Sequence, residues 1–104
     1  MNSFCFKSYA PSLSDKSKAE YILTEIRKLN PQQNQIIVDF DGLIAMTTIC
    51  ARIIFGRLYK ELGKDLFYNN IKMKNIEDSI RIVIKWGIMK ELEQSDDLLN
   101  VSNE

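Results

Sequence analysis

The segment formed by residues 36–40 places the strongest constraint on the fold of this chain. It is apolar throughout except at Asp39, and Asp41 and Gly42 follow it directly. Apolar side chains at both alternating sets of positions are typical of a strand that is covered on both faces, as in a parallel sheet. The sequence therefore predicts that residues 36–40 form a central strand, which ends in a turn made by Asp39, Asp41 and Gly42.

The sequence before this segment predicts one strand and one helix. Apolar and small residues alternate along residues 3–9, which indicates a strand that stops at Pro11. Asp15 is well placed to cap a helix that ends at Asn30 and Pro31. The apolar face of that helix is formed by residues at helical spacing: Ala19, Ile22, Leu23, Ile26 and Leu29.

The sequence after this segment continues the alternation. Thr47 or Thr48 can cap a second helix that runs to Gly63, and residues 67–73 indicate a further strand. Asn75 can cap the last helix. The sequence predicts an α/β fold: a small layer with a central, mostly parallel sheet of three to four strands and about three helices.

The last helix carries two apolar stripes. One stripe, suited to cover the sheet, contains Ile76, Ile80, Val83, Ile84 and Gly87. The other contains Ile82, Trp86 and Met89. Leu98, Leu99 and Val101 could cover this second stripe, or it could be a protein interface such as a dimer seam. Residues 1–94 are expected to form one domain, and residues 95–104 a loose acidic tail.

The composition excludes several classes of function. Fourteen basic and fourteen acidic side chains give no net charge, so neither nucleic acid nor a membrane is an expected partner. No apolar run is long enough to span a bilayer, and no secretion signal is seen at the start, so a cytoplasmic location is expected. The chain has no histidine, which removes the commonest general base. Cys5 and Cys50, interpreted as small buried residues, have no further ligands near them, and we expect no metal site and no cofactor.

The pattern Asp39-Phe40-Asp41-Gly42 resembles the nucleophile loop of haloacid-dehalogenase-like phosphatases. That resemblance implies a small magnesium-dependent phosphatase in which Asp39 attacks phosphate. However, Leu43 stands where that family usually has Thr, and the other elements of its site do not follow at suitable positions. The alternative interpretation is structural, with both carboxylates accepting hydrogen bonds from amides of the turn.

Five segments taken together resemble another family, the STAS-like domains, named after sulfate transporters and anti-sigma factor antagonists. These segments are SDKSKAEYILTEI, IIVDFDGLIAMTT, ARIIFGRLYKELG, IKMKN and IEDSIRIVIKW. Their order and spacing agree with the family pattern of a central strand, a helix, a strand that ends near Asn, and a closing helix. The resemblance implies a non-enzymatic, bacterial regulatory domain that binds a protein partner.

In anti-sigma factor antagonists, a partner kinase phosphorylates a Ser or Thr at the start of the helix after the central strand. The resemblance places Thr48 at that acceptor position, with Thr47 beside it, and implies a kinase or ATPase-like regulator as partner. This chain lacks the Asp and the Gly that flank the acceptor in the parent pattern, and both Thr residues can instead serve as helix caps. The expected partner-binding residues are Ile44, Met46, Thr47, Thr48, Ile49 and Arg52.

Overall fold

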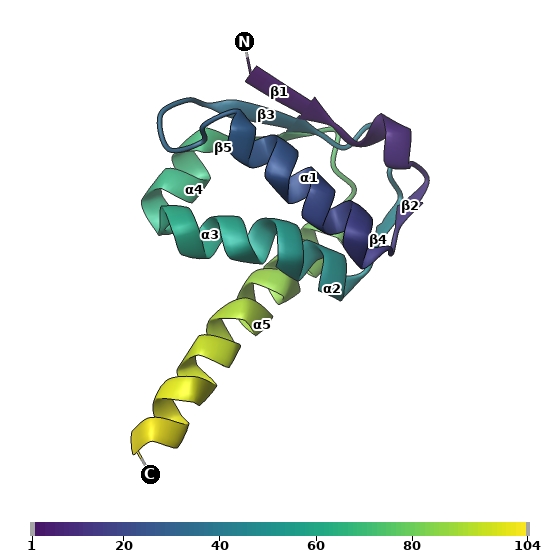
Figure 1. Cartoon of the computed structure of the whole chain (residues 1–104). Coiled ribbons are helices and arrows are strands. Elements are labelled where there is room, and N and C mark those ends of the chain that lie inside the picture. The colour runs from purple at the N-terminus through teal and green to yellow at the C-terminus, as the bar shows by residue number, and fades with distance from the viewer. Residues whose placement is uncertain (1, 104) are drawn as a thin grey trace.

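Three parallel strands form a sheet that lies along one side of the fold, above the helices in Figure 1. The structure is a computed structural model, and it describes the backbone of residues 2–103 and the side chains of residues 2–93. Within these residues, β1 (Asn2–Cys5), β3 (Ile36–Asp39) and β5 (Ile71–Lys74) lie in the order β1-β3-β5. The predicted α/β fold, with residues 36–39 as its central strand, is therefore confirmed.

The other elements connect and flank these strands. They are η1 (Phe6–Tyr9), β2 (Ser12–Leu13), α1 (Lys16–Lys28), β4 (Ala45–Met46), α2 (Thr48–Ala51), η2 (Arg52–Gly56), α3 (Arg57–Leu62), α4 (Lys64–Asn70) and α5 (Asp78–Asn103). The short strands β2 and β4 pair in parallel as a separate two-stranded sheet. In Figure 1, the far part of α5 projects away from the rest of the molecule.

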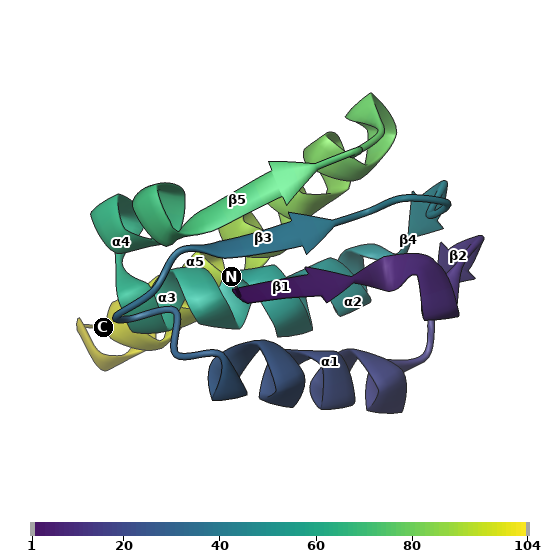
Figure 2. The same cartoon turned by 90° about the horizontal axis from the view of Figure 1, so that it is seen from above.

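The helices lie on one face of the sheet, and the other face is open (Figure 2). Connections between parallel neighbouring strands are right-handed in nearly all proteins. Because the strand order advances in one direction, both connections fall on the same side. The prediction that the central strand is covered on both faces is therefore wrong: Ile36 and Val38 are fully buried, whereas Ile37 and Asp39 on the other side are only partly buried.

An aromatic cluster forms the part of the core next to β1. The ring centroids of Phe6 and Phe40 are 4.8 Å apart, and those of Phe40 and Phe55 are 5.8 Å apart. The strand predicted over residues 3–9 ends at Cys5, because the 3-10 helix η1 turns Phe6 into this cluster. Cys5 is exposed on the open face, contrary to expectation, whereas Cys50 is buried.

The first helix agrees with the sequence analysis. The Asp15 side chain accepts hydrogen bonds from the amides of Ser17 and Lys18, at 2.8 and 3.3 Å. It thereby caps α1, as predicted. The residues predicted to form the apolar face of α1 are buried or partly buried in the core: Ala19, Ile22, Leu23, Ile26 and Leu29.

The predicted second helix contains one π-helical turn, η2, between α2 and α3. At this turn, the backbone of the helix is in close contact with the backbone of α5. A Cβ atom added to Gly87 would lie 2.6 Å from the backbone nitrogen of Arg52, and one added to Gly56 would lie 3.0 Å from the Gly87 carbonyl oxygen. The two glycines allow the backbones to touch, and this contact sets the position of α5.

Two predicted elements near β5 need correction. The strand expected over residues 67–73 begins only at Ile71, because residues up to Asn70 belong to α4. Asn75 does not cap the last helix: it adopts a positive φ of 55°, and α5 begins three residues later. Its side chain instead donates a hydrogen bond to Asp39 at the end of β3.

The helix α5 is the longest element. The predicted boundary between a domain and a tail after residue 94 falls inside it. That boundary stays a prediction, because the side chains beyond Glu93 lie outside the described residues. Within residues 2–103, no helix combines the length and the apolar character needed to cross a membrane.

Candidate functional site

The carboxyl ends of β3 and β5 are linked by Asp39. Its Oδ1 atom accepts a hydrogen bond from the backbone amide of Asp41 and another from Nδ2 of Asn75, each at 3.0 Å. Gly42 follows with a φ of 83°, and the amide of Leu43 donates to the Phe40 carbonyl at 2.9 Å. Asp39 thus closes the turn after its own strand and holds the end of the neighbouring strand.

These contacts lower the pKa of Asp39 below its ordinary value. The side-chain hydrogen bond from Asn75 is the largest cause, followed by the backbone hydrogen bond from Asp41 and by the positive charges of Lys74 and Lys7. Each of these favours the ionised carboxylate over the protonated form. The folded structure therefore stabilises the ionised form of the Asp39 side chain.

A hollow of about 340 Å³ lies beside this link, between the loop after β3 and the loop after β5. Its lining includes Asp41, Ile44, Asn75 and Glu77. Within the described side chains, no three Asp, Glu or Cys residues are grouped closely enough to hold a metal ion. A phosphatase of the kind that the sequence resembles would use a carboxylate oxygen of Asp39 as its nucleophile. In this structure, the Oδ1 atom of Asp39 accepts two hydrogen bonds that close the turn.

Thr47 and Thr48 differ in their contacts at the start of α2. Thr47 is the N-cap, since its Oγ1 accepts a hydrogen bond from the amide of Cys50 at 3.3 Å. Its own amide donates to the Leu13 carbonyl at 3.0 Å, which holds this turn against β2. Thr48 is partly exposed and begins the helix, and no side-chain hydrogen bond of Thr48 is found among the described residues.

Two large apolar side chains flank this pair. Ile44 is 61% exposed and Ile49 is 49% exposed, on either side of the two Thr residues in the sequence. Met46, which the sequence analysis placed on the same surface, is only 6% exposed and belongs to the core. Alternation along β4 explains this difference, because it turns the side chain of Met46 inward.

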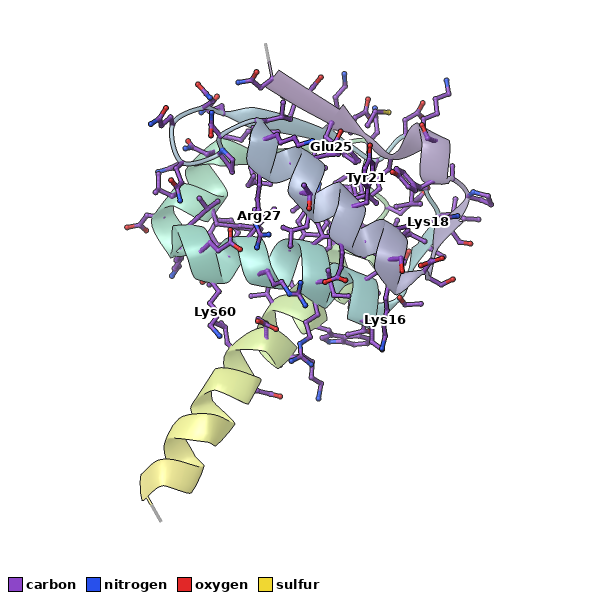
Figure 3. The ribbon with its side chains drawn as sticks, in the orientation of Figure 1. Lys16, Lys18, Tyr21, Glu25, Arg27 and Lys60 are labelled. Carbon is purple, nitrogen blue, oxygen red and sulfur yellow. The ribbon has the colours of Figure 1, made fainter. Side chains whose placement is uncertain are left out.

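Arg52 connects this surface to α5. Its Nε atom lies 2.9 Å from Oε1 of Glu91, and Nζ of Lys60 lies 4.0 Å from Oε2 of the same carboxylate. A cavity of about 430 Å³ lies beside this ion pair and is lined by Lys16, Glu20, Ile49, Arg52, Ile53, Arg57 and Glu91. Figure 3 shows Lys16 at the start of α1, next to α2, and Lys60 on α3.

The second apolar stripe of α5 is exposed. Trp86 is 53% exposed, and Ile82 and Met89 are exposed to a similar degree. The sequence offers Leu98, Leu99 and Val101 as a cover for this stripe, and these residues lie outside the described side chains. The described part of the chain therefore leaves a continuous apolar stripe on the outer side of α5.

Sequence reasoning missed two long-range contacts of these surfaces. The position of Asn75 before the last helix predicts a cap, although an Asn that follows a strand can also reach the end of the neighbouring strand. Nothing near Glu91 in the sequence indicates its ion pair with Arg52. Each contact joins residues more than thirty positions apart.

The comparison with known families comes from one match. No curated protein and no solved structure matches the chain. A family model described as a STAS-like domain of unknown function matches residues 18–81, which is more than half of the sequence. The match covers most of α1, the central strand, the helices after it, β5 and the first turn of α5. On this evidence the chain belongs to the family of STAS-like domains.

Proposed function

We propose that this STAS-like domain is a regulatory module that acts by binding a protein partner and not by catalysis. The binding surface is the helix-start surface, defined here as Ile44, Thr47, Thr48, Ile49 and Arg52. One observation carries this proposal: two large isoleucine side chains, 61% and 49% exposed, flank the start of α2. Burial of such side chains at an interface removes apolar area from water, which favours association.

The resemblance to anti-sigma factor antagonists supports a regulated interaction. In those proteins, phosphorylation at the start of the helix after the central strand determines which partner is bound. Thr48 holds the matching position here, and Thr47 already performs the capping role. The partner we infer is a kinase or an ATPase-like regulator in the cytoplasm.

The surroundings of Thr48 suggest how phosphorylation would act. Arg52 lies one helical turn further on, and its backbone amide donates to the Thr48 carbonyl. A phosphate at Thr48 adds up to about two negative charges beside this guanidinium. It would compete with Glu91 for Arg52 and so weaken the link between α2 and α5. Phosphorylation would therefore change both the charge of the helix-start surface and its connection to α5.

A pull-down with surface variants tests the main proposal. The full-length chain with Ile44→Asp and Ile49→Asp, and separately the wild type, are immobilised and exposed to lysate of the source organism. A partner recovered by the wild type is then purified and titrated by calorimetry. We expect the double variant to bind at least about tenfold more weakly, because each change places a charge where apolar area must be buried.

Leu66→Asp is the matched control, since Leu66 is also an exposed apolar residue but lies on α4. It should leave the affinity unchanged. Recovery of no stoichiometric partner, or equal binding by wild type and double variant, would contradict the proposal. Circular dichroism of each variant establishes that the fold is retained.

A second candidate function is self-association through α5. The observation that favours it is the exposed stripe of Ile82, Trp86 and Met89, whose spacing places all three on one side of the helix. A helix that is apolar on an outward side is suited to pack against a copy of itself. In this case the domain would be a homodimer.

A further inference from the structure

The outer edge of β5 is free to pair with another strand. β5 is an edge strand, and in Figure 2 its outer side faces away from the rest of the chain. The Phe40 amide donates to the Lys74 carbonyl at 2.9 Å, so the backbone groups of Lys74 point toward β3. Because these groups alternate along a strand, those of Met73 and Ile71 point outward. The Ile71 amide donates to the Phe67 carbonyl, which leaves the Ile71 carbonyl and both groups of Met73 at the free edge.

An apolar cleft lies beside this edge on the side of the helices. It has a volume of about 140 Å³ and is lined by Phe67, Tyr68, Met73, Arg81, Ile84, Lys85 and Ile88. A cavity of about 150 Å³ is large enough to hold a benzene molecule. The cleft therefore has room for one apolar side chain from a strand added to β5.

Basic side chains surround the cleft and the free edge. Arg81 and Lys85 are exposed at the rim of the cleft, and Lys72 and Lys74 lie on the open face of β5. Among the described side chains, none of these four forms an ion pair. Lys72 donates to the Tyr68 carbonyl at 3.2 Å.

Within residues 2–93, no carboxylate lines the cleft, whose charged lining residues are Arg81 and Lys85. On the open face, Asp39 lies opposite Lys74 in the register of β3 and β5, and its negative charge offsets that of Lys74. Lys72 lies opposite the apolar Ile37, and Asp78 in the first turn of α5 forms no ion pair with Arg81 among the described residues. The rim of the cleft thus carries positive charge from Arg81 and Lys85, and Lys72 adds a further positive charge on the open face, although the whole chain has no net charge.

We propose that an extended acidic peptide from a partner protein binds here by adding a strand to β5. Peptides that extend a sheet gain affinity from main-chain hydrogen bonds and specificity from alternate side chains. Side chains that point toward the helices enter the cleft beside Met73. Side chains that point the other way lie next to Lys72 and Lys74. The favoured peptide therefore alternates acidic and apolar residues, with an apolar side chain between two acidic ones.

This binding groove, defined as the edge of β5 together with the cleft, is independent of the helix-start surface. The two share no residue. A partner bound at the start of α2 and a peptide bound at β5 could therefore occupy the domain at the same time. Failure of one proposal leaves the other standing.

Selection from a random peptide library displayed on phage tests the groove directly. The full-length chain is the bait, and an enriched peptide is then synthesised, labelled with fluorescein and titrated by fluorescence anisotropy. We expect the enriched sequences to place an apolar residue between two acidic ones. We also expect the Arg81→Glu, Lys85→Glu double variant to bind at least tenfold more weakly, and the affinity to fall as salt rises.

Two further variants make the result specific. Lys90→Glu reverses an exposed charge on another side of α5 and should change the affinity less than twofold. Lys72→Glu, Lys74→Glu leaves the helix intact and should weaken binding as the first double variant does. Backbone amide signals in NMR spectra should shift at Met73 when the peptide binds, and the spectra also show whether each variant is folded.

Three outcomes would overturn the proposal. The first is that the selection enriches no acidic sequences. The second is that an enriched peptide binds both double variants as tightly as it binds the wild type. The third is that the shifted signals lie on β1 or at the start of α2. Each of these would mean that the lysines on β5 only prevent contact between sheet edges, which is a common role of charge on edge strands.

Discussion

Asp39 shows how one side chain at the end of a strand can join separate parts of the chain. It receives hydrogen bonds from the next turn and from Asn75, which lies thirty-six positions further on. In the register of the sheet it lies between Cys5 and Lys74, on the open face. The side chain is therefore accessible, yet its contacts are those of a structural residue that holds β3 and β5 together.

Replacement of Asp39 by Asn is expected to make the stability less dependent on pH. The folded pKa lies below the ordinary value of about 3.9, so the ionised side chain stabilises the fold above that value. This contribution is lost as the pH falls through the folded pKa. The gap in melting temperature between wild type and Asp39→Asn should therefore narrow when the pH is lowered from neutral into the acid range below 4.

Thermal unfolding at a series of pH values measures this gap. Asn75→Ala removes the largest cause of the shift and should show the same narrowing. Gln33→Ala, at an exposed amide far from this link, should differ from the wild type by a constant amount. A gap that stays constant for Asp39→Asn would contradict the prediction. Turnover of a phosphate ester with magnesium that is lost in Asp39→Asn would instead favour the phosphatase interpretation.

Among the elements, the contact between η2 and α5 determines where the last helix lies. Gly87 rests directly on the backbone of Ala51 and Arg52, and Gly56 lies against the Gly87 carbonyl. The ion pair of Arg52 with Glu91 lies beside this contact. The packing uses backbone against backbone, and so it has no flexible side chain that could move aside to admit a larger residue.

The substitution Gly87→Ala should destabilise the protein. A Cβ atom there would lie 2.6 Å from the Arg52 nitrogen and 2.7 Å from the Ala51 carbonyl carbon, so the helices must move apart. Such overpacking costs about 1 to 3 kcal/mol. That cost should exceed the gain of about 1 kcal/mol that Ala brings to a helix in place of Gly.

Urea unfolding followed by circular dichroism measures the change in free energy of unfolding. Ser79→Ala, at an exposed site in the first turn of the same helix, is the matched control and should have a small effect. A Gly87→Ala variant that is more stable than the wild type would show that the two helices do not approach as closely as described.

At the scale of the whole molecule, several surfaces that proteins usually cover are exposed. One face of the sheet is open, both edge strands are free of further pairing within the described residues, and α5 presents Trp86 and its apolar neighbours outward (Figures 1 and 2). Parallel sheets usually have both faces covered. A domain of this architecture is therefore suited to contacts with other chains.

Self-association through α5 makes a definite prediction. Sedimentation equilibrium at rising concentration should show a dimer for the wild type and a monomer for Trp86→Glu, because the charge would be placed inside the interface. Tyr21→Glu is the matched control, since Tyr21 is a similarly exposed aromatic residue on α1 (Figure 3). It should leave the dimer intact. A wild type that is monomeric at every concentration would rule out the dimer.

The sequence by itself determined those parts that depend on local chemistry. Asp15 and the apolar spacing after it specify α1, because a cap and a helical face are both encoded within about four turns of chain. The apolar segment at residues 36–39 specifies the central strand, and its order with the neighbouring segments identified the STAS-like family. These signals need no partner from elsewhere in the sequence.

Only the tertiary structure decided the features that depend on distant residues. Residues 6–9 leave the strand because Phe6 packs on Phe40 and Phe55, which outweighs the local alternation. Asn75 binds to Asp39, although its position alone suggested a cap. The helices cover only one face of the sheet because the strand order β1-β3-β5 advances in one direction. The apolar pattern of a single strand does not encode this order. The open face, the free edge of β5 and the cleft beside it could therefore be found only in the folded molecule.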